Sequence, residues 1–329
     1  VINMDKLKKV GLTALGTALV STSAISADVA VGGGATLTFT GGDKGTEGNG
    51  WTFLDSLTFR ASADLDNGWT VSTAQNLGKG SINNSNMKVN MGDMGTLEFH
   101  TAGGTSVPGS WDDMMPAANE ESWNGLTGDT AGVGPLSAKG AVGGMFRYSI
   151  NVMDGIDLYA SYAPSSGATA VESSSSFGVQ YTGVEGLTVG YANGDNNVKT
   201  AVTNGLATAS AAGAEIENTS LFVKYAFDSF TIGMQDNESD SGTANADFDY
   251  RGYGISYAVT EDMSISYGQG TADFELAGSS DQETTAVGVS YTSGGITVSG
   301  SMHDGENLGG SAATTADKQD YEINISFAF

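Results

Sequence analysis

Apolar and polar side chains alternate along most of the chain after residue 27, and this period of two constrains the fold more than any other feature. The final segment, 319–329, shows it most cleanly, because its apolar side chains occupy every second position: Tyr321, Ile323, Ile325, Phe327 and Phe329. Successive side chains of a β-strand point to opposite faces of the sheet, so the pattern predicts strands with one apolar and one polar face.

The same alternation predicts an all-β fold of about sixteen antiparallel strands. They lie near residues 28–40, 51–65, 69–78, 84–91, 95–101, 145–151, 156–163, 174–182, 187–193, 217–227, 229–235, 250–259, 263–270, 283–292, 296–303 and 319–329. Short turns alternate with long polar connections, of which 102–144 is by far the longest. Tight turns at one end and long loops at the other are typical of a transmembrane β-barrel.

A soluble two-sheet sandwich is the alternative, because each of its strands would show the same alternation. The strand count and the loop asymmetry favour the barrel. Tyrosines provide a third argument, since several of them fall on the apolar face near strand ends, as in the aromatic girdles of membrane barrels: Tyr148, Tyr162, Tyr181, Tyr191, Tyr225, Tyr257, Tyr267 and Tyr291.

The amino-acid composition argues against several classes of function. The chain has no Cys and only two His residues, which leaves little material for a metal site, a thiol nucleophile or a histidine base. We therefore expect no cofactor, no metal and no enzymatic activity. The formal net charge of −25 disfavours nucleic acid as a partner and attracts cations.

The first 27 residues have the three parts of a secretory signal peptide. Lys6, Lys8 and Lys9 precede a short apolar run at 10–20, and small residues follow up to Ala27. A membrane anchor is the alternative, but the apolar run is well short of the roughly 20 residues that a spanning helix needs. We therefore predict cleavage after Ala27, with residues 28–329 forming the barrel.

Several motifs resemble the general porin family of Gram-negative bacteria. Residues 95–99, Gly-Thr-Leu-Glu-Phe, are similar to the strand before the family's third loop. Arg-Tyr-Ser at 147–149 and the stretch 156–164, which ends in Tyr-Ala-Pro, are similar to the hairpin after that loop, and the terminal Phe329 is similar to the family's aromatic C-terminus.

The resemblance implies a sixteen-stranded barrel in the outer membrane, surrounded by lipid and assembled as a homotrimer. It implies that the third loop, 102–144, folds into the lumen of a water-filled channel for passive diffusion of small hydrophilic solutes and ions. It also implies that Phe329 is an assembly signal. The chain departs from the family at His100-Thr101, where many members have Gly-Arg, and it lacks a recognisable Pro-Glu-Phe motif. The charge of the pore must therefore be worked out from this chain itself.

Two sets of charged residues are candidates for the pore. The third loop carries the carboxylates expected to line the narrowing: Asp112, Asp113, Glu120 and Glu121. Strand parity turns four bases toward the lumen: Arg60, Lys88, Arg147 and Lys224. Opposite charges across a narrowing would set up a transverse field. The alternatives are that the loop packs on the rim, and that the bases face inward only because lipid would exclude them.

The other acidic residues cluster in the expected external connections, as in the stretch 236–240, which we interpret as a solvated loop, with weak binding of divalent ions as the alternative. Arg251 falls on the apolar face near a strand end and is expected at the rim or at a subunit contact. This acidic excess predicts mild cation selectivity. A substrate-specific channel and a structural or adhesive barrel without an open pore are the alternative functions.

Overall fold

The computed structural model describes residues 28–43, 50–126, 133–136, 143–165, 171–198 and 215–329, so the expected signal peptide lies outside the described residues. The described chain forms sixteen strands: β1 (Asp28–Gly42), β2 (Trp51–Asp64), β3 (Thr70–Gly78), β4 (Ser81–Asn90), β5 (Thr96–Ala102), β6 (Met145–Met153), β7 (Ile156–Ala163), β8 (Val171–Tyr181), β9 (Leu187–Val198), β10 (Glu215–Phe227), β11 (Phe230–Asp240), β12 (Phe248–Ala258), β13 (Met263–Phe274), β14 (Gln282–Ser293), β15 (Ile296–Glu306) and β16 (Lys318–Ala328). Short helical turns lie in the connections: η1 (Gly92–Met94), α2 (Val107–Ser110), η2 (Leu308–Gly310) and η3 (Thr314–Ala316).

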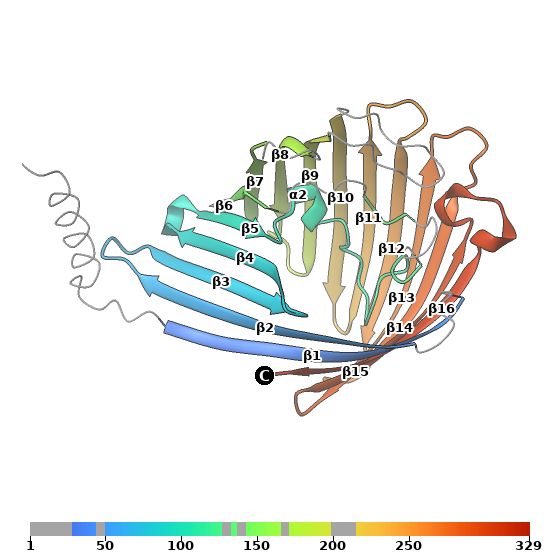
Figure 1. Cartoon of the computed structure of the whole chain (residues 1–329), viewed down its shortest axis with the longest axis horizontal. Coiled ribbons are helices and arrows are strands. Elements are labelled where there is room, and N and C mark those ends of the chain that lie inside the picture. Colours follow the sequence, from blue (N-terminus) through green and yellow to red (C-terminus); the bar gives the residue numbers. More distant parts are fainter. Residues whose placement is uncertain (1–27, 44–49, 127–132, 137–142, 166–170, 199–214) are drawn as a thin grey trace, which may run out of the picture.

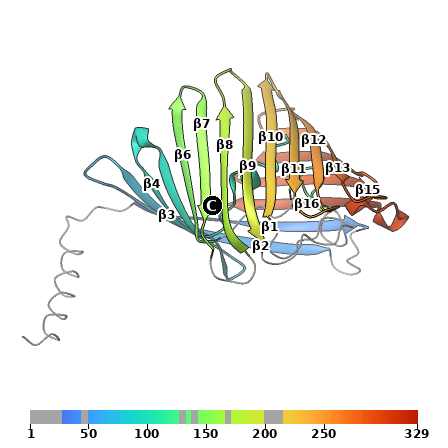
Figure 2. The ribbon, with the colours of Figure 1, turned by 90° about the horizontal axis from the view of Figure 1, so that it is seen from above.

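The strands form one closed antiparallel barrel. Each strand pairs with its neighbours in the sequence, and β1 also pairs with β16 to complete the ring. Figures 1 and 2 show the ring from two directions, with β1 and β2 running beside the red C-terminal strands. The predicted fold class and the number of strands are confirmed.

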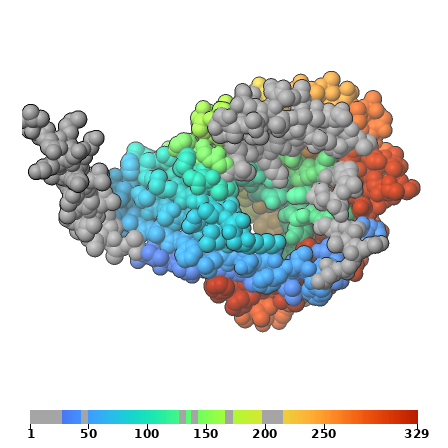
Figure 3. All heavy atoms as spheres, viewed as in Figure 1, coloured from blue at the N-terminus to red at the C-terminus, as the bar shows by residue number. Residues whose placement is uncertain are grey.

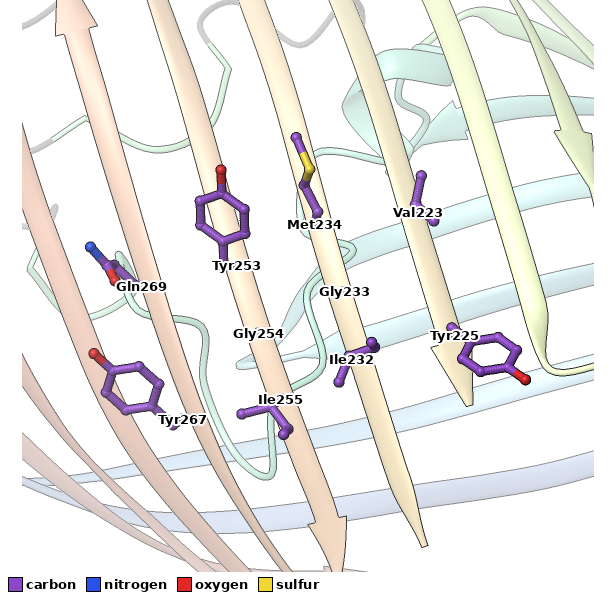
Figure 4. A pocket seen from close by; sticks show the side chains of 10 residues that line it. All are labelled: Val223, Tyr225, Ile232, Gly233, Met234, Tyr253, Gly254, Ile255, Tyr267 and Gln269. Carbon is purple, nitrogen blue, oxygen red and sulfur yellow. The ribbon is translucent and has the colours of Figure 1, made fainter. Parts of the chain in front are cut away.

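The alternating pattern turns the apolar side chains outward. Along β16, Ile323, Ile325 and Phe327 are all exposed on this outer face. On β10 to β13 the outer side chains border a shallow groove of about 580 Å³, lined by residues such as Tyr225, Ile232 and Tyr253 (Figure 4). Such an exterior requires lipid rather than water as its surroundings. Among the described residues, no helix is long and apolar enough to cross a membrane.

Several strands extend further than their alternation predicts. β11 continues to Asp240 and β9 to Val198, so the acidic stretch 236–240 is part of a strand rather than a loop. These ends are polar on both faces, and for that reason they carry no period-two signal. Arg251 lies on the outer face of β12, where its Nη2 is 2.7 Å from Asp236 Oδ2.

The closure of the barrel depends on a close approach at its seam. The backbones of Gly33 and Phe329 exchange hydrogen bonds of 2.9 and 3.0 Å, which extend the pairing of β1 with β16 to the last residue. A Cβ atom on Gly33 would lie 2.6 Å from the backbone oxygen of Ser56 and 2.7 Å from the ring of Phe329. A side chain at position 33 therefore displaces either β2 or the terminal ring. The role of Phe329 as an assembly signal remains a prediction.

We predict that Gly33→Ala destabilises the barrel by about 1–3 kcal/mol, the typical cost of overpacking. The measurement is the temperature at which the folded form, seen by its heat-modifiable electrophoretic mobility, is lost. Gly268→Ala on β13 is the matched control, because its Cβ would meet nothing closer than 3.7 Å. Equal unfolding temperatures for the two variants would contradict the packing argument.

Candidate functional site

The third connection, between β5 and β6, is anchored to the polar face of the wall by an apolar cluster. The turn α2 begins at Ser106, whose hydroxyl accepts a hydrogen bond of 3.1 Å from Gly109 N. The turn leads to Trp111, whose ring packs edge-on against Phe222 of β10 and Tyr159 of β7, with centroids 5.5 and 5.3 Å apart. These contacts fix the start of the segment against the side of the wall opposite the apolar exterior.

A buried glutamine then holds the backbone of the segment. Gln235 of β11 is 1% exposed. Its Nε2 donates to Trp111 O at 2.6 Å, and its Oε1 accepts from Met114 N at 2.8 Å. The hydroxyl of Ser220 on β10 also donates to Trp111 O, at 2.9 Å. Side chains of the wall thus replace the backbone partners that this irregular segment lacks.

The segment next crosses the inner face of the wall toward the C-terminal strands. Ala118 N donates to Ser266 Oγ of β13 at 2.8 Å. The amide of Asn119 bonds the hydroxyls of Ser299 and Ser301 on β15, at 2.6 and 3.0 Å. A chain this short can contact β7 and β15 together only across the interior, so the polar face is the inner one. Figure 1 shows α2 and the chain that follows it within the ring of strands, and Figure 3 shows green atoms there.

A second apolar cluster anchors the later part of the segment. Trp123 and Val133 pack against three inner residues of β12 and β13: Phe248, Tyr250 and Ala272. Ser122 Oγ lies 3.1 Å from Thr284 Oγ1 of β14. The described part of the third connection is therefore bound at several points on one side of the lumen.

The four loop carboxylates predicted for the narrowing lie on this bound segment. Asp112 is only 3% exposed, while Asp113 is exposed and Glu120 and Glu121 are half-buried. Glu120 accepts a hydrogen bond from the side chain of Asn124. Burial raises the pKa of the Glu121 carboxyl to about 7, and the nearby charges of Asp113, Glu120 and Asp112 act in the same direction. The four groups thus belong to one electrostatic cluster.

Two of the predicted bases lie on the inner wall beside an acid that the sequence analysis missed. Glu98 of β5 lies between Lys88 of β4 and Arg147 of β6 in the strand register. Its carboxylate is 2.5 Å from Lys88 Nζ and 3.0 Å from His100 Nε2. Arg147 Nη2 donates to Ser110 Oγ of the third connection at 3.2 Å. Strand parity places Glu98 on the inner face, but the sequence analysis considered it only as part of a family motif.

The other two bases are separate from this group. Arg60 lies on β2 and is exposed. Lys224 Nζ of β10 lies 5.8 Å from the centroid of the Phe222 ring, on the side of the wall that holds the third connection. The structure therefore does not gather the four bases into one cluster.

A closed barrel with an apolar exterior, a polar interior and a segment bound inside it defines a membrane channel of the outer-membrane type. The comparisons agree, because residues 11–329 match the Gram-negative porin family. The chain belongs to this family. It is an outer-membrane protein and a non-enzymatic porin channel.

Solved structures of low identity share the fold. OmpT of Vibrio cholerae is 15% identical, with a TM-score of 0.68, and the match covers 92% of this chain and 98% of that one. OmpF of Salmonella typhi, solved with daunomycin, is 12% identical, with a TM-score of 0.69 and coverage of 92% and 97%. An anion-selective porin from Comamonas acidovorans is 14% identical, with a TM-score of 0.65 and coverage of 92% and 100%. No curated protein sequence matches significantly.

Proposed function

We propose that this porin is a mildly cation-selective channel for passive diffusion of small hydrophilic solutes and ions, narrowed by its third connection. The carboxylate cluster of that connection carries the proposal. Asp113, Glu120 and Asp112 act electrostatically on Glu121, and the segment that bears all four is bound to the inner wall. An opening beside such a cluster raises the local concentration of cations.

The inner bases oppose this effect only in part. Glu98 offsets the charge of Lys88 by a direct ion pair. The net charge of the chain is −25, and this excess of negative charge also favours cations. One fold relative is named an anion-selective porin, and the barrel by itself therefore does not determine the sign of the selectivity.

We predict that the triple variant Asp113→Asn, Glu120→Gln, Glu121→Gln lowers the cation-to-anion permeability ratio. A unit charge about 8 Å from a passing ion in water contributes about 0.5 kcal/mol, roughly a factor of two in ion concentration. At about pH 8 or above, where Glu121 is also charged, three such charges give up to about eightfold before salt screens them. The measurement is the reversal potential across a planar bilayer under a salt gradient.

The matched control removes three carboxylates from the outer face of β11: Asp236→Asn, Glu238→Gln and Asp240→Asn. We expect a smaller change in reversal potential from this variant. Anion preference in the unmodified protein would refute the proposed selectivity. An equal effect of the two triple variants would refute the place given to the third connection.

We also predict that cation preference increases with pH. The pKa of Glu121 is raised to about 7, so the carboxyl is neutral below that value and charged above it. The reversal potential should therefore shift toward the cation value between about pH 6 and pH 8. Glu121→Gln should remove this shift, whereas Glu261→Gln, in the turn after β12, should retain it. A shift that persists in Glu121→Gln would assign it to another group.

We propose a homotrimer that buries the outer face of β1 to β3. Asp55 lies on this face between Phe53 and Leu57. Its register partner on β1, Ala35, pairs on its other side with Phe327 of β16, so Asp55 lies at the level of the apolar band. Gln75 of β3 lies on the same face, paired with Phe59. A carboxylate exposed to lipid at this depth is unfavourable, and a protein partner would remove that exposure. One fold relative, OmpT of Vibrio cholerae, has been solved in a trimer form.

We predict that the native protein has three times the mass of one chain in mild detergent and that Asp55→Arg dissociates it. The Arg side chain is longer than that of Asp and has the opposite charge, so it disrupts packing on the proposed contact face. Asp273→Arg, on the outer face of β13, should leave the trimer intact. A monomeric wild type, or a trimer that tolerates Asp55→Arg, would contradict the assignment. The measurement is native mass spectrometry.

A further inference from the structure

A second buried glutamine binds two different connections at once. Gln282, the first residue of β14, is 1% exposed and lies on the inner face. Its Nε2 donates to Val133 O at 2.9 Å, and its Oε1 accepts from Val133 N at 2.9 Å. The side-chain amide thus makes with Val133 the same two hydrogen bonds that a strand backbone makes with its partner.

The same oxygen also binds the eighth connection, residues 307–317 between β15 and β16. Gly309 N donates to Gln282 Oε1 at 2.9 Å. One atom therefore lies 2.9 Å from an amide nitrogen of the third connection and 2.9 Å from one of the eighth. The eighth connection turns inward tightly here, with Gly309 and Gly310 at φ angles of 67° and 85°.

Apolar contacts accompany this bridge. A Cβ atom on Gly305 would lie 2.9 Å from Leu126 Cδ1 and 2.9 Å from Leu308 Cδ2, so the two leucines cover the same inner position of β15. Leu308 is buried, although it belongs to an external connection. Burial of the eighth connection is thus shared with the third.

We propose that Gln282 is a positioning residue of the narrowing, whose amide joins the third and eighth connections into one rim that sets which solutes pass. The proposal rests on the channel function above. The amide is required, because a carboxylate cannot donate to Val133 O and a shorter Asn side chain does not reach both connections. The eighth connection becomes a second determinant of solute size, although it is remote from the third in sequence.

Gln282→Leu tests the proposal, since it keeps a side chain of comparable volume and removes all three hydrogen bonds. Loss of these hydrogen bonds raises the population of the arrangement in which the third and eighth connections are apart by about tenfold or more. We expect liposome swelling with a solute near the exclusion limit to speed up by at least about twofold, with a smaller change for a small sugar. Gln319→Leu is the matched control, because Gln319 lies on the outer face of β16 and bonds Asp304. Leu308→Ser loosens the same contact from the other side and should act in the same direction.

A cross-link separates positioning from general loss of stability. The chain has no Cys, so Leu126→Cys and Leu308→Cys introduce the only two thiols. A short bis-maleimide that joins them in the Gln282→Leu background should restore wild-type swelling rates. Folding of each variant is checked by heat-modifiable mobility. The proposal would be overturned if folded Gln282→Leu and Leu308→Ser swell at the wild-type rate. It would also be overturned if the cross-linked variant still swells faster than wild type. A wild type that conducts nothing would instead refute the channel function.

Discussion

Each backbone amide and carbonyl that crosses lipid needs a hydrogen-bond partner within the protein, because the membrane core offers none. Sixteen antiparallel strands meet this requirement only when the first pairs with the last, and β1 and β16 do so over their shared length. Closure in turn sets the side-chain pattern. One face of every strand meets lipid and the other meets the interior, so alternation along the chain becomes the division between outside and inside.

The third connection is irregular and lies inside the ring of strands, so its backbone needs hydrogen-bond partners wherever it is buried against the wall. Its carbonyl and amide groups find partners among polar side chains of the strands, such as Gln235 for Trp111 and Met114. The polar inner face is therefore a set of specific partners as well as a wet surface, and its serines, asparagines and glutamines place the segment in one position.

The fold was predictable from the sequence because closure leaves a signal in every strand. The strand ends beyond the apolar band were not, since polar residues on both faces, as in β11 from Asp236 to Asp240, erase the alternation. The unusual length of the third connection marked it as a candidate for the narrowing, and the role of its carboxylates stays a prediction. Glu98 was recoverable from parity alone, whereas Gln282 was not. A buried glutamine that pairs with Val133 and Gly309 looks in the sequence like any polar residue at the start of a strand.

The contacts of the third connection divide the lumen unequally. The hydrogen bonds and ring contacts described above reach from β6 through β15, whereas Arg60 and Lys88 on β2 and β4 lie on the other part of the wall. Charge is divided only in part, because Arg60 and Lys88 lie opposite the segment's carboxylates, whereas Arg147 and Lys224 lie on the side that binds the segment. Since an ion pair holds Lys88 to Glu98, the field that we propose across the opening depends more on the segment than on the bases that face it. In the proposed channel, the backbone partners that place this segment therefore also determine the charge that a passing ion meets.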